Sequence, residues 1–262
     1  MSGQIEYIVG TSGYSFADWV GPFYPAGTKQ GEMFREYCVH FGAVELNFTF
    51  YRLEAGGTLD KLAQRSPEDF QFWVKANRKI THDGELAAVK IFLENLEPMA
   101  GSGKLSGVLL QFPQSFHRTV DNRKYLGETL EELAGVELAV EFRHSSWDQE
   151  STVEGLRERE VTLVVPDSPE VRGLYRPEVT ATTSTGYLRL HSRDAGKWYA
   201  GAVARYDYDY SEAEMGELAK KWSGPELGAQ KVFAFFNNCH GGQAAKNAEA
   251  FSRIVEQLGG DD

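Results

Sequence analysis

Ionisable and amide side chains stand near the ends of several apolar segments of this 262-residue sequence. Glu45, Glu141 and His191 are of types that transfer protons, and we predict that they are catalytic, with a glutamate as general base and the histidine as general acid. The polar residues near them include arginines, whose planar fork of N–H donors matches a phosphate or a carboxylate. We therefore predict a site for a small polar or anionic ligand, with these ligand-binding residues: Thr11, Ser12, Asn47, Lys75, His82, Gln111, Arg143, Asp167, Arg189, Asn237 and Asn238.

The same residue types also permit a divalent-metal site. Its ligands would be Glu45, Glu141, Asp167 and His191. The alternative is a buried ionic network in which the glutamates pair with nearby arginines and a lysine. Because hard cations bind oxygen ligands best where no cationic side chain competes, we expect the network and predict no cofactor, with a divalent metal as the open alternative.

Two short motifs allow further chemistry. Residues 10–13, Gly-Thr-Ser-Gly, follow a predicted strand, and the N–H groups and hydroxyls of such a turn can hold an anion, although plain turn chemistry explains the glycines as well. Cys239 precedes His240, a pair that would suit a nucleophilic thiolate. No Ser/His/Asp triad signature, nucleophile elbow, Walker loop or dinucleotide-binding fingerprint accompanies them.

Strand-like apolar segments would position these residues, and segments with helical periodicity alternate with them. The predicted strands are 6–12, 43–50, 70–75, 107–112, 137–143, 161–167, 186–191 and 231–238. The predicted helices include 31–41, 85–99, 123–134, 214–222 and 244–258, and we expect 169–184 to form a loop with a short helix. Alternation of this kind predicts an α/β fold, a single (β/α)8 TIM-type barrel of parallel strands with outer helices, as one domain over residues 1–262. An open doubly wound sheet is the alternative.

The phase of each strand indicates which side chains face inward. In 43–50, Val44 and Leu46 share one face while Glu45 and Asn47 share the other, and several other strands repeat this split. Sites in such barrels form where the strands end. We therefore predict that the following residues converge at that mouth: Glu45, Asn47, Lys75, Gln111, Glu141, Arg143, Asp167, Arg189 and His191.

Seven motif blocks occur in order along the chain, at residues 10–25, 44–53, 70–82, 107–116, 140–147, 187–192 and 233–248. In sequence and in order they resemble the blocks of the YecE-like family, domain of unknown function 72. The resemblance implies a TIM-type barrel, but it implies no reaction. The chain departs from the family pattern at Ser192, where a glycine is usual, and at Cys239, where an acid is usual, so that the resemblance carries no role for that acid here.

Composition narrows the function classes. A net charge of −11 without a basic stripe argues against nucleic acid as a partner, because such binding depends on clustered Lys and Arg. The sequence has no apolar run of membrane-spanning length and begins without a secretory signal pattern, so we expect no membrane partner and a cytoplasmic location. The two cysteines, Cys38 and Cys239, are expected to be reduced thiols. The oligomeric state stays open.

Three functions remain. We favour an enzyme, a hydrolase, lyase or isomerase, that acts on a small phosphate- or carboxylate-bearing substrate by acid–base chemistry at the barrel mouth. A metal-dependent phosphoesterase or endonuclease-like hydrolase is the second hypothesis. A non-catalytic ligand-binding protein, with the same pocket but no proton transfer, is the third.

Overall fold

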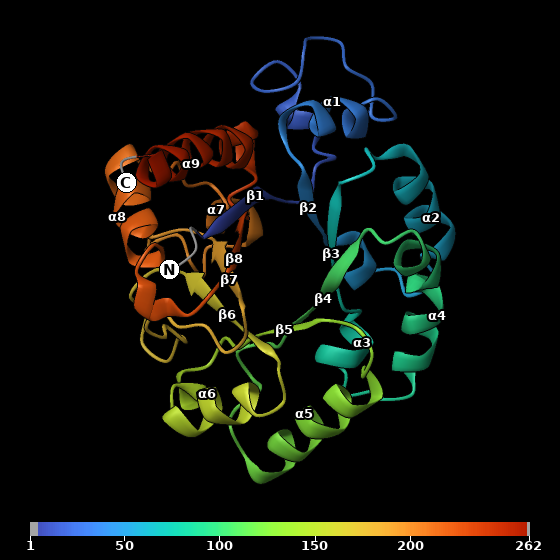
Figure 1. The fold of residues 1–262 in the computed structure, drawn as a ribbon, viewed down its shortest axis with the longest axis vertical. Helices are drawn as coiled ribbons and strands as arrows, with labels where there is room; N and C mark the ends of the chain where they lie inside the picture. The colour runs from blue at the N-terminus through green and yellow to red at the C-terminus, as the bar shows by residue number, and fades with distance from the viewer. Residues whose placement is uncertain (1–4, 261–262) are drawn as a thin grey trace.

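A closed barrel of eight parallel strands forms the centre of the computed structural model, which describes residues 5–260 (Figure 1). Each strand pairs with the next along the chain, and the last strand pairs with the first. The strands are β1 (Glu6–Ser12), β2 (Ala43–Leu46), β3 (Gln71–Lys75), β4 (Leu105–Gln111), β5 (Leu138–Glu141), β6 (Thr162–Asp167), β7 (Thr185–Leu190) and β8 (Lys231–Phe236). The predicted (β/α)8 TIM-type barrel is confirmed, and the open sheet is excluded.

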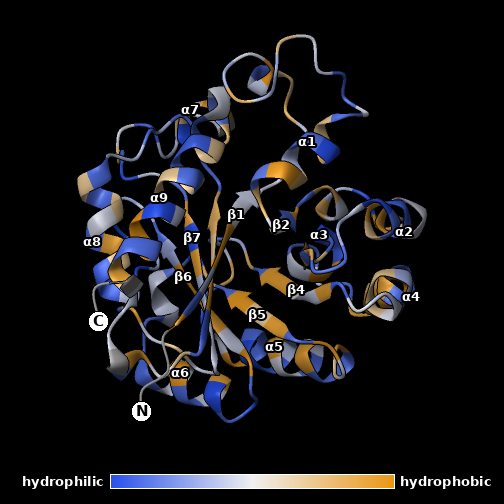
Figure 2. Cartoon of the chain, turned by 45° about the horizontal axis from the view of Figure 1, so that its top comes forward, coloured by the Kyte–Doolittle hydropathy of each residue, from blue (hydrophilic) through white to orange (hydrophobic). Residues whose placement is uncertain are grey.

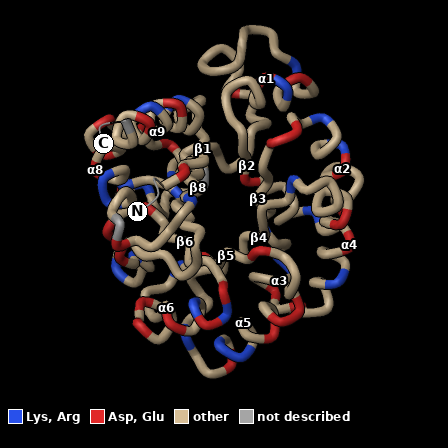
Figure 3. Tube along the Cα trace, in the orientation of Figure 1, with Lys and Arg blue, Asp and Glu red and all other residues tan. Residues whose placement is uncertain are grey.

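Helices surround the barrel, and charged residues lie mostly along these helices and the loops between elements (Figure 3). The longer helices are α1 (Met33–His40), α2 (Gly56–Arg65), α4 (Ala88–Gly101), α5 (Val120–Glu132), α6 (Glu150–Arg157), α8 (Glu212–Trp222) and α9 (Gln243–Gly260). Two single-turn helices, α3 (Arg78–Thr81) and α7 (Ala202–Arg205), lie in connections. Within residues 5–260, no helix has the length and hydropathy needed to span a membrane.

Two predicted elements were wrong in detail. Residues 169–184 contain no helix, because prolines and a glycine interrupt the segment. The segment instead pairs with the loop after β5 through an isolated β-bridge between His144 and Leu174. β2 ends at Leu46 rather than at residue 50, and residues 48–50 form a 3-10 turn. Thr49 stabilises this turn, because its hydroxyl donates a hydrogen bond of 2.6 Å to the carbonyl oxygen of Lys75.

Many strand residues are hydrophobic (Figure 2), and the strands separate two apolar layers. The outer layer packs the strands against the helices, as alternation requires. The inner layer fills the barrel and is mainly aromatic, with Trp73 in edge-on contact with Tyr187 at 4.8 Å and with Phe233 at 5.5 Å between ring centroids. Because this apolar plug occupies the lower barrel, the polar inward-facing residues lie above it, at the end where the strands finish.

The plug depends on a glycine in β4. An added Cβ at Gly107 would lie 2.5 Å and 2.6 Å from ring atoms of Trp73 and 2.7 Å from the carbonyl oxygen of Glu137. We expect Gly107→Ala to lower the free energy of unfolding by about 1–3 kcal/mol, measured by urea denaturation, since overpacking forces neighbours to shift. Gly216→Ala in α8, where nothing lies within 4 Å of an added Cβ, is the control and should raise stability by about 0.5–1 kcal/mol. Unchanged stability of Gly107→Ala would contradict this packing.

Candidate functional site

The mouth of the barrel contains a cavity of about 220 Å³. Seven of the predicted ligand-binding residues line it: Ser12, Asn47, Lys75, Gln111, Arg143, Arg189 and Asn237. The three predicted catalytic residues, Glu45, Glu141 and His191, are fully buried and contact the arginines of this lining. Strand phase explains the grouping, because each of these residues extends the inward-facing series of its strand.

Arg189 is at the centre of the site and is 1% exposed. Its Nε and Nη2 donate to the two carboxylate oxygens of Glu45 at 2.8 Å and 2.6 Å, and its Nη1 donates to Glu141. The hydroxyl of Tyr187 donates a further hydrogen bond of 2.8 Å to Glu45. Burial alone would raise the pKa of Glu45, but the charge and hydrogen bonds of Arg189 outweigh burial and lower it. Glu45 is therefore ionised, and its partners are Arg189 and the hydroxyls of Tyr187 and Ser12.

The other glutamate bridges the two arginines. Glu141 forms ion pairs with Arg189 and with Arg143, and its pKa is held well below the ordinary value because these guanidinium groups outweigh burial. His191 lies 3.4 Å from Glu141, 3.1 Å from Arg143 Nη2 and 3.0 Å from Asn237 Nδ2. Burial and the charge of Arg143 lower the pKa of His191 to about 3. His191 is therefore neutral at pH 7 and packed beside the ion pairs.

Lys75 differs from the arginines because it has no carboxylate within ion-pair distance among the described residues. Its Nζ donates to Gln111 Oε1 at 2.8 Å and lies 4.3 Å from the ring centroid of Phe50. Burial and the charge of Arg189 lower the pKa of Lys75 from 10.5 to about 7. In the network, two glutamates balance two arginines, so the protonation of Lys75 decides whether the mouth is neutral or carries one positive charge.

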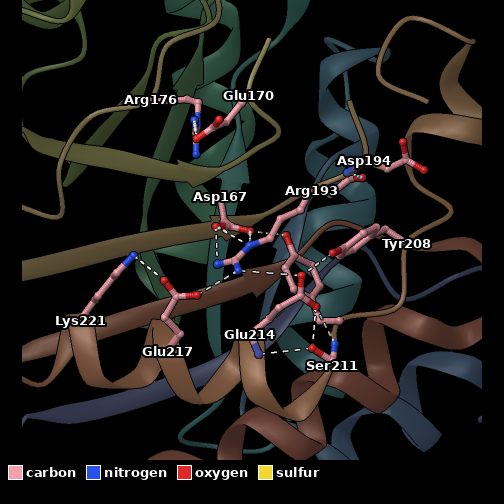
Figure 4. Close-up of polar contacts among 12 residues, drawn as sticks. Asp167, Glu170, Arg176, Arg193, Asp194, Tyr208, Ser211, Glu214, Glu217 and Lys221 are labelled. Carbon is pink, nitrogen blue, oxygen red and sulfur yellow. Dashed lines mark hydrogen bonds and ion pairs between the residues drawn. The ribbon is translucent and has the colours of Figure 1, made fainter. Parts of the chain in front are cut away.

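Asp167 is not at the mouth, although we predicted it there. It lies on the outer face of β6, where Arg193 Nε contacts Asp167 Oδ2 at 2.9 Å (Figure 4). The Tyr210 hydroxyl donates a hydrogen bond of 2.8 Å to Asp167. The prediction considered only its place at the strand end. Parity in β6 puts Asp167 on the face of Leu163 and Val165, which pack outward. The four side chains proposed as metal ligands therefore do not form one cluster.

Three other predicted residues also lie outside the cavity. Thr11 faces α1, where its backbone N–H donates to the Tyr37 hydroxyl at 2.9 Å. Asn238 donates to Asn247 Oδ1 in α9 at 2.8 Å, and so holds a loop against that helix. His82 is exposed and packs edge-on against Phe50, a residue of the cavity lining, at 4.8 Å between ring centroids. Thr11 and Asn238 thus have structural contacts, and His82 lies beside the mouth.

The structure does not favour the two motif-based alternatives, anion binding by the glycine turn at residues 10–13 and a nucleophilic thiolate at Cys239. The Gly13 N–H donates to the Glu45 carbonyl oxygen at 2.8 Å, and an added Cβ at Gly10 would lie 2.3 Å from the Ala43 carbonyl oxygen, so the glycine turn serves strand packing. Cys239 lines the cavity, but burial raises the pKa of its thiol, which disfavours a thiolate. Among residues 5–260, no group of three or more His, Cys, Asp or Glu side chains is placed to hold a metal ion.

Sequence reasoning missed the aromatic part of the mouth. Phe16, Phe50, Tyr51 and Tyr206 line the cavity, and Tyr51 is 81% exposed at its rim. Trp198 covers the network from the loop after β7, with its ring 5.6 Å from the Arg143 guanidinium carbon. Phe50 and Tyr51 lie in one of the recognised motif blocks, so that block was a usable signal. Trp198 and Tyr206 belong to an irregular loop, and no periodicity marks their direction.

Comparisons with known proteins agree with the resemblance seen in the sequence. A family model described as "Protein of unknown function DUF72" matches residues 8–261. The UPF0759 protein YunF of Bacillus subtilis is 28% identical, over 95% of this chain and 94% of that protein. A crystal structure of a DUF72 family protein from Thermotoga maritima has a TM-score of 0.89 and 37% identity, over 96% of this chain and 99% of that one. A second, from Enterococcus faecalis, has a TM-score of 0.84 and 25% identity, over 95% of each chain.

Proposed function

Since the chain belongs to the DUF72 family of proteins of unknown function, we propose its function from the chemistry of the barrel mouth alone. In this proposal the protein is an enzyme. It binds a small phosphate- or carboxylate-bearing substrate on Arg143 and Lys75, and it transfers a proton at Lys75 Nζ. The observation that carries this proposal is the lowered pKa of Lys75, about 7, in a cavity of ligand size. A group with this pKa is present in both protonation states at neutral pH.

The buried carboxylates and the histidine have a different role in this proposal from the one we first predicted. Glu45 and Glu141 have lowered pKa values and both are committed to arginines, so they are poor bases. His191, with a pKa of about 3, is a poor acid. These three residues instead hold the guanidinium groups in position, which is what precise recognition of an anion requires. Lys75 then provides the acid–base chemistry.

The residues around Lys75 support a small polar substrate. Arg143 is 13% exposed and can present its guanidinium group to an anion. Gln111, Asn47 and Asn237 add neutral hydrogen-bonding groups to the lining. One basic amine beside a fixed cation suits proton removal next to a carboxylate- or phosphate-bearing carbon, as in a lyase or an isomerase. A metal-dependent hydrolase has no supporting observation, because the arginines already occupy the carboxylates.

Anion binding at the mouth is expected to weaken as pH rises. Sulfate is a suitable probe because its own charge is constant between pH 6 and pH 9. Lys75 is cationic below its pKa of about 7 and neutral above it, so sulfate affinity should fall about tenfold between pH 6.5 and pH 8.5. Isothermal titration calorimetry across this range measures the change.

Matched lysine variants test whether this dependence comes from Lys75. Lys75→Gln should have weak, pH-independent sulfate binding, whereas Lys61→Gln, at an exposed position in α2, should behave like the parent protein. Sulfate binding that is equally strong at both pH values would contradict the proposed role of Lys75. A metabolite screen by thermal shift then separates the remaining functions, because an enzyme consumes its ligand and a binding protein returns it unchanged.

A further inference from the structure

A second cleft lies outside the barrel, between α5 and α6, which are neighbours in the lower part of Figure 1. We call it the α5–α6 cleft. It encloses about 220 Å³, and the residues that matter to its chemistry are Arg118, Arg123, Gly127, Thr152, Gly155 and Arg159. The residues lining the mouth cavity are entirely different, so the two cavities are separate sites.

Three arginines surround the cleft, although the chain has a net charge of −11. Within residues 5–260, neither Arg118, Arg123 nor Arg159 forms an ion pair with a carboxylate. Arg118 is instead held in place, because its Nη2 donates to the Ser151 hydroxyl at 2.8 Å and its backbone N–H donates to the Ser146 hydroxyl at 2.9 Å. The cleft therefore brings together three guanidinium groups with which no described carboxylate forms an ion pair.

A buried hydroxyl gives independent evidence for a ligand. Thr152 is only 5% exposed, lines the cleft, and its Oγ1 has no hydrogen-bond partner in the described structure. The Nε of Arg118 is also buried and lacks a partner there. Buried polar atoms are normally paired, because leaving one unpaired costs about 1–3 kcal/mol. A bound anion at this end of the cleft could accept hydrogen bonds from both groups.

The remainder of the cleft is apolar and kept open by glycines. Leu126, Leu130 and Leu156 line it, and all three are at least nine-tenths buried. Gly127 and Gly155 occupy the interiors of the two facing helices, where glycine lowers helix stability relative to alanine. Close packing does not explain Gly127, because an added Cβ would meet nothing within 4 Å. The missing side chains widen the cleft above its leucines.

We propose that the α5–α6 cleft is a second binding site, which takes a small molecule with one anionic group and an apolar body the size of a single ring. The anionic group binds between Arg118, Arg123 and the Thr152 hydroxyl, where α5 and α6 both begin and their N-terminal dipoles favour negative charge. The apolar body lies over the leucines between the two glycines. Arg159, which donates to the Gly155 carbonyl oxygen at 3.0 Å, closes the other end.

Phenyl phosphate has an anionic group and a single apolar ring, and it serves as the probe. Inorganic phosphate has the anionic group without the ring, and it serves as the comparison ligand. Titrations use the full chain carrying Lys75→Gln, so that anion binding at the mouth is weakened. We expect phenyl phosphate to bind at least fivefold more tightly than inorganic phosphate, and its amide chemical-shift changes in NMR spectra to map to α5 and α6. Shifts confined to the mouth would overturn the proposal.

Three variants test the cleft residues. Arg123→Gln should weaken phenyl phosphate binding at least fivefold, and Thr152→Val, which keeps the side-chain shape, should weaken it about threefold to tenfold, the range of one lost hydrogen bond. Gly127→Leu should fill the cleft and abolish binding while leaving the helix intact. Arg157→Gln, on the exposed part of α6 outside the cleft, should leave the affinity unchanged. Equal affinity in Arg123→Gln, Gly127→Leu and the parent would refute the site.

Discussion

Replacing Arg189 with methionine is expected to lower the free energy of unfolding by about 3–5 kcal/mol, because it leaves a buried carboxylate without its cation. Glu45 would keep the hydroxyls of Tyr187 and Ser12 as partners but no cation, and Glu141 would keep Arg143. Both glutamates are fully buried, so water cannot replace the lost guanidinium group. Urea denaturation followed by circular dichroism measures the loss.

An outer ion pair provides the control for this prediction. Arg193 pairs with Asp167 and Glu217 but is 24% exposed, so Arg193→Met should cost only about 1 kcal/mol. A double-mutant cycle adds a second check. Once Arg189 is gone, Glu45→Gln removes an unpaired charge, so the double variant should be more stable than Arg189→Met alone. Equal losses in Arg189→Met and Arg193→Met would contradict the central role of Arg189.

Lys75→Met is expected to change activity and stability in opposite directions. Loss of the proposed acid–base group should reduce turnover of the substrate found by screening by about 10²–10⁴-fold. Stability should increase at pH 6, because the folded state resists protonation of Lys75: its pKa is about 7 in the fold, against 10.5 for a lysine side chain in water. The penalty develops as pH falls from 10.5 to 7 and is complete below 7. After allowance for solvent contact, the gain should be about 1–3 kcal/mol.

The pH dependence of that gain separates charge from packing. Denaturation at pH 6 and at pH 10.5 should show a large stabilisation at the lower pH and little at the higher one. Lys61→Met, on the exposed face of α2, should show no such difference. A Lys75→Met protein that is less stable than the parent at pH 6 would show that Lys75 is not destabilised by burial of its charge.

Strand phase made much of the fold and of the site predictable. Glu45, Glu141 and Arg189 each interrupt an otherwise apolar strand at an inward-facing position, and closing the parallel strands into a barrel brings such residues together. The errors came from judging residues by closeness to a strand end. Asp167 and Asn238 lie one residue out of phase with the inner face, so Asp167 contacts the loop residues Arg193 and Tyr210 outside the barrel, and Asn238 contacts Asn247 in α9. Counting alternate positions along β6 and β8 would have excluded both residues from the predicted site.

Other features left no signal in local pattern. Trp198 reaches the network from a loop, where side-chain direction depends on the whole fold rather than on a repeat. The lowered pKa of Lys75 is a sum of burial and the opposed charges of its neighbours, which only coordinates can supply. The sequence also did not predict the α5–α6 cleft, because glycines and arginines are common in exposed helices and their pattern does not indicate a cavity.

The aromatic side chains below the ionic network close the barrel interior, so the cavity at the mouth is open on the side where the strands end. Trp73, Tyr187 and Phe233 fill the interior, so there is no route through the barrel to its other end. Under the proposed function, substrate, product and displaced water would all pass the mouth of the barrel, where the ring of Tyr51 is exposed. In such an enzyme a product molecule would have to leave before the next substrate molecule enters, so the product would inhibit the reaction by competing with the substrate for the cavity.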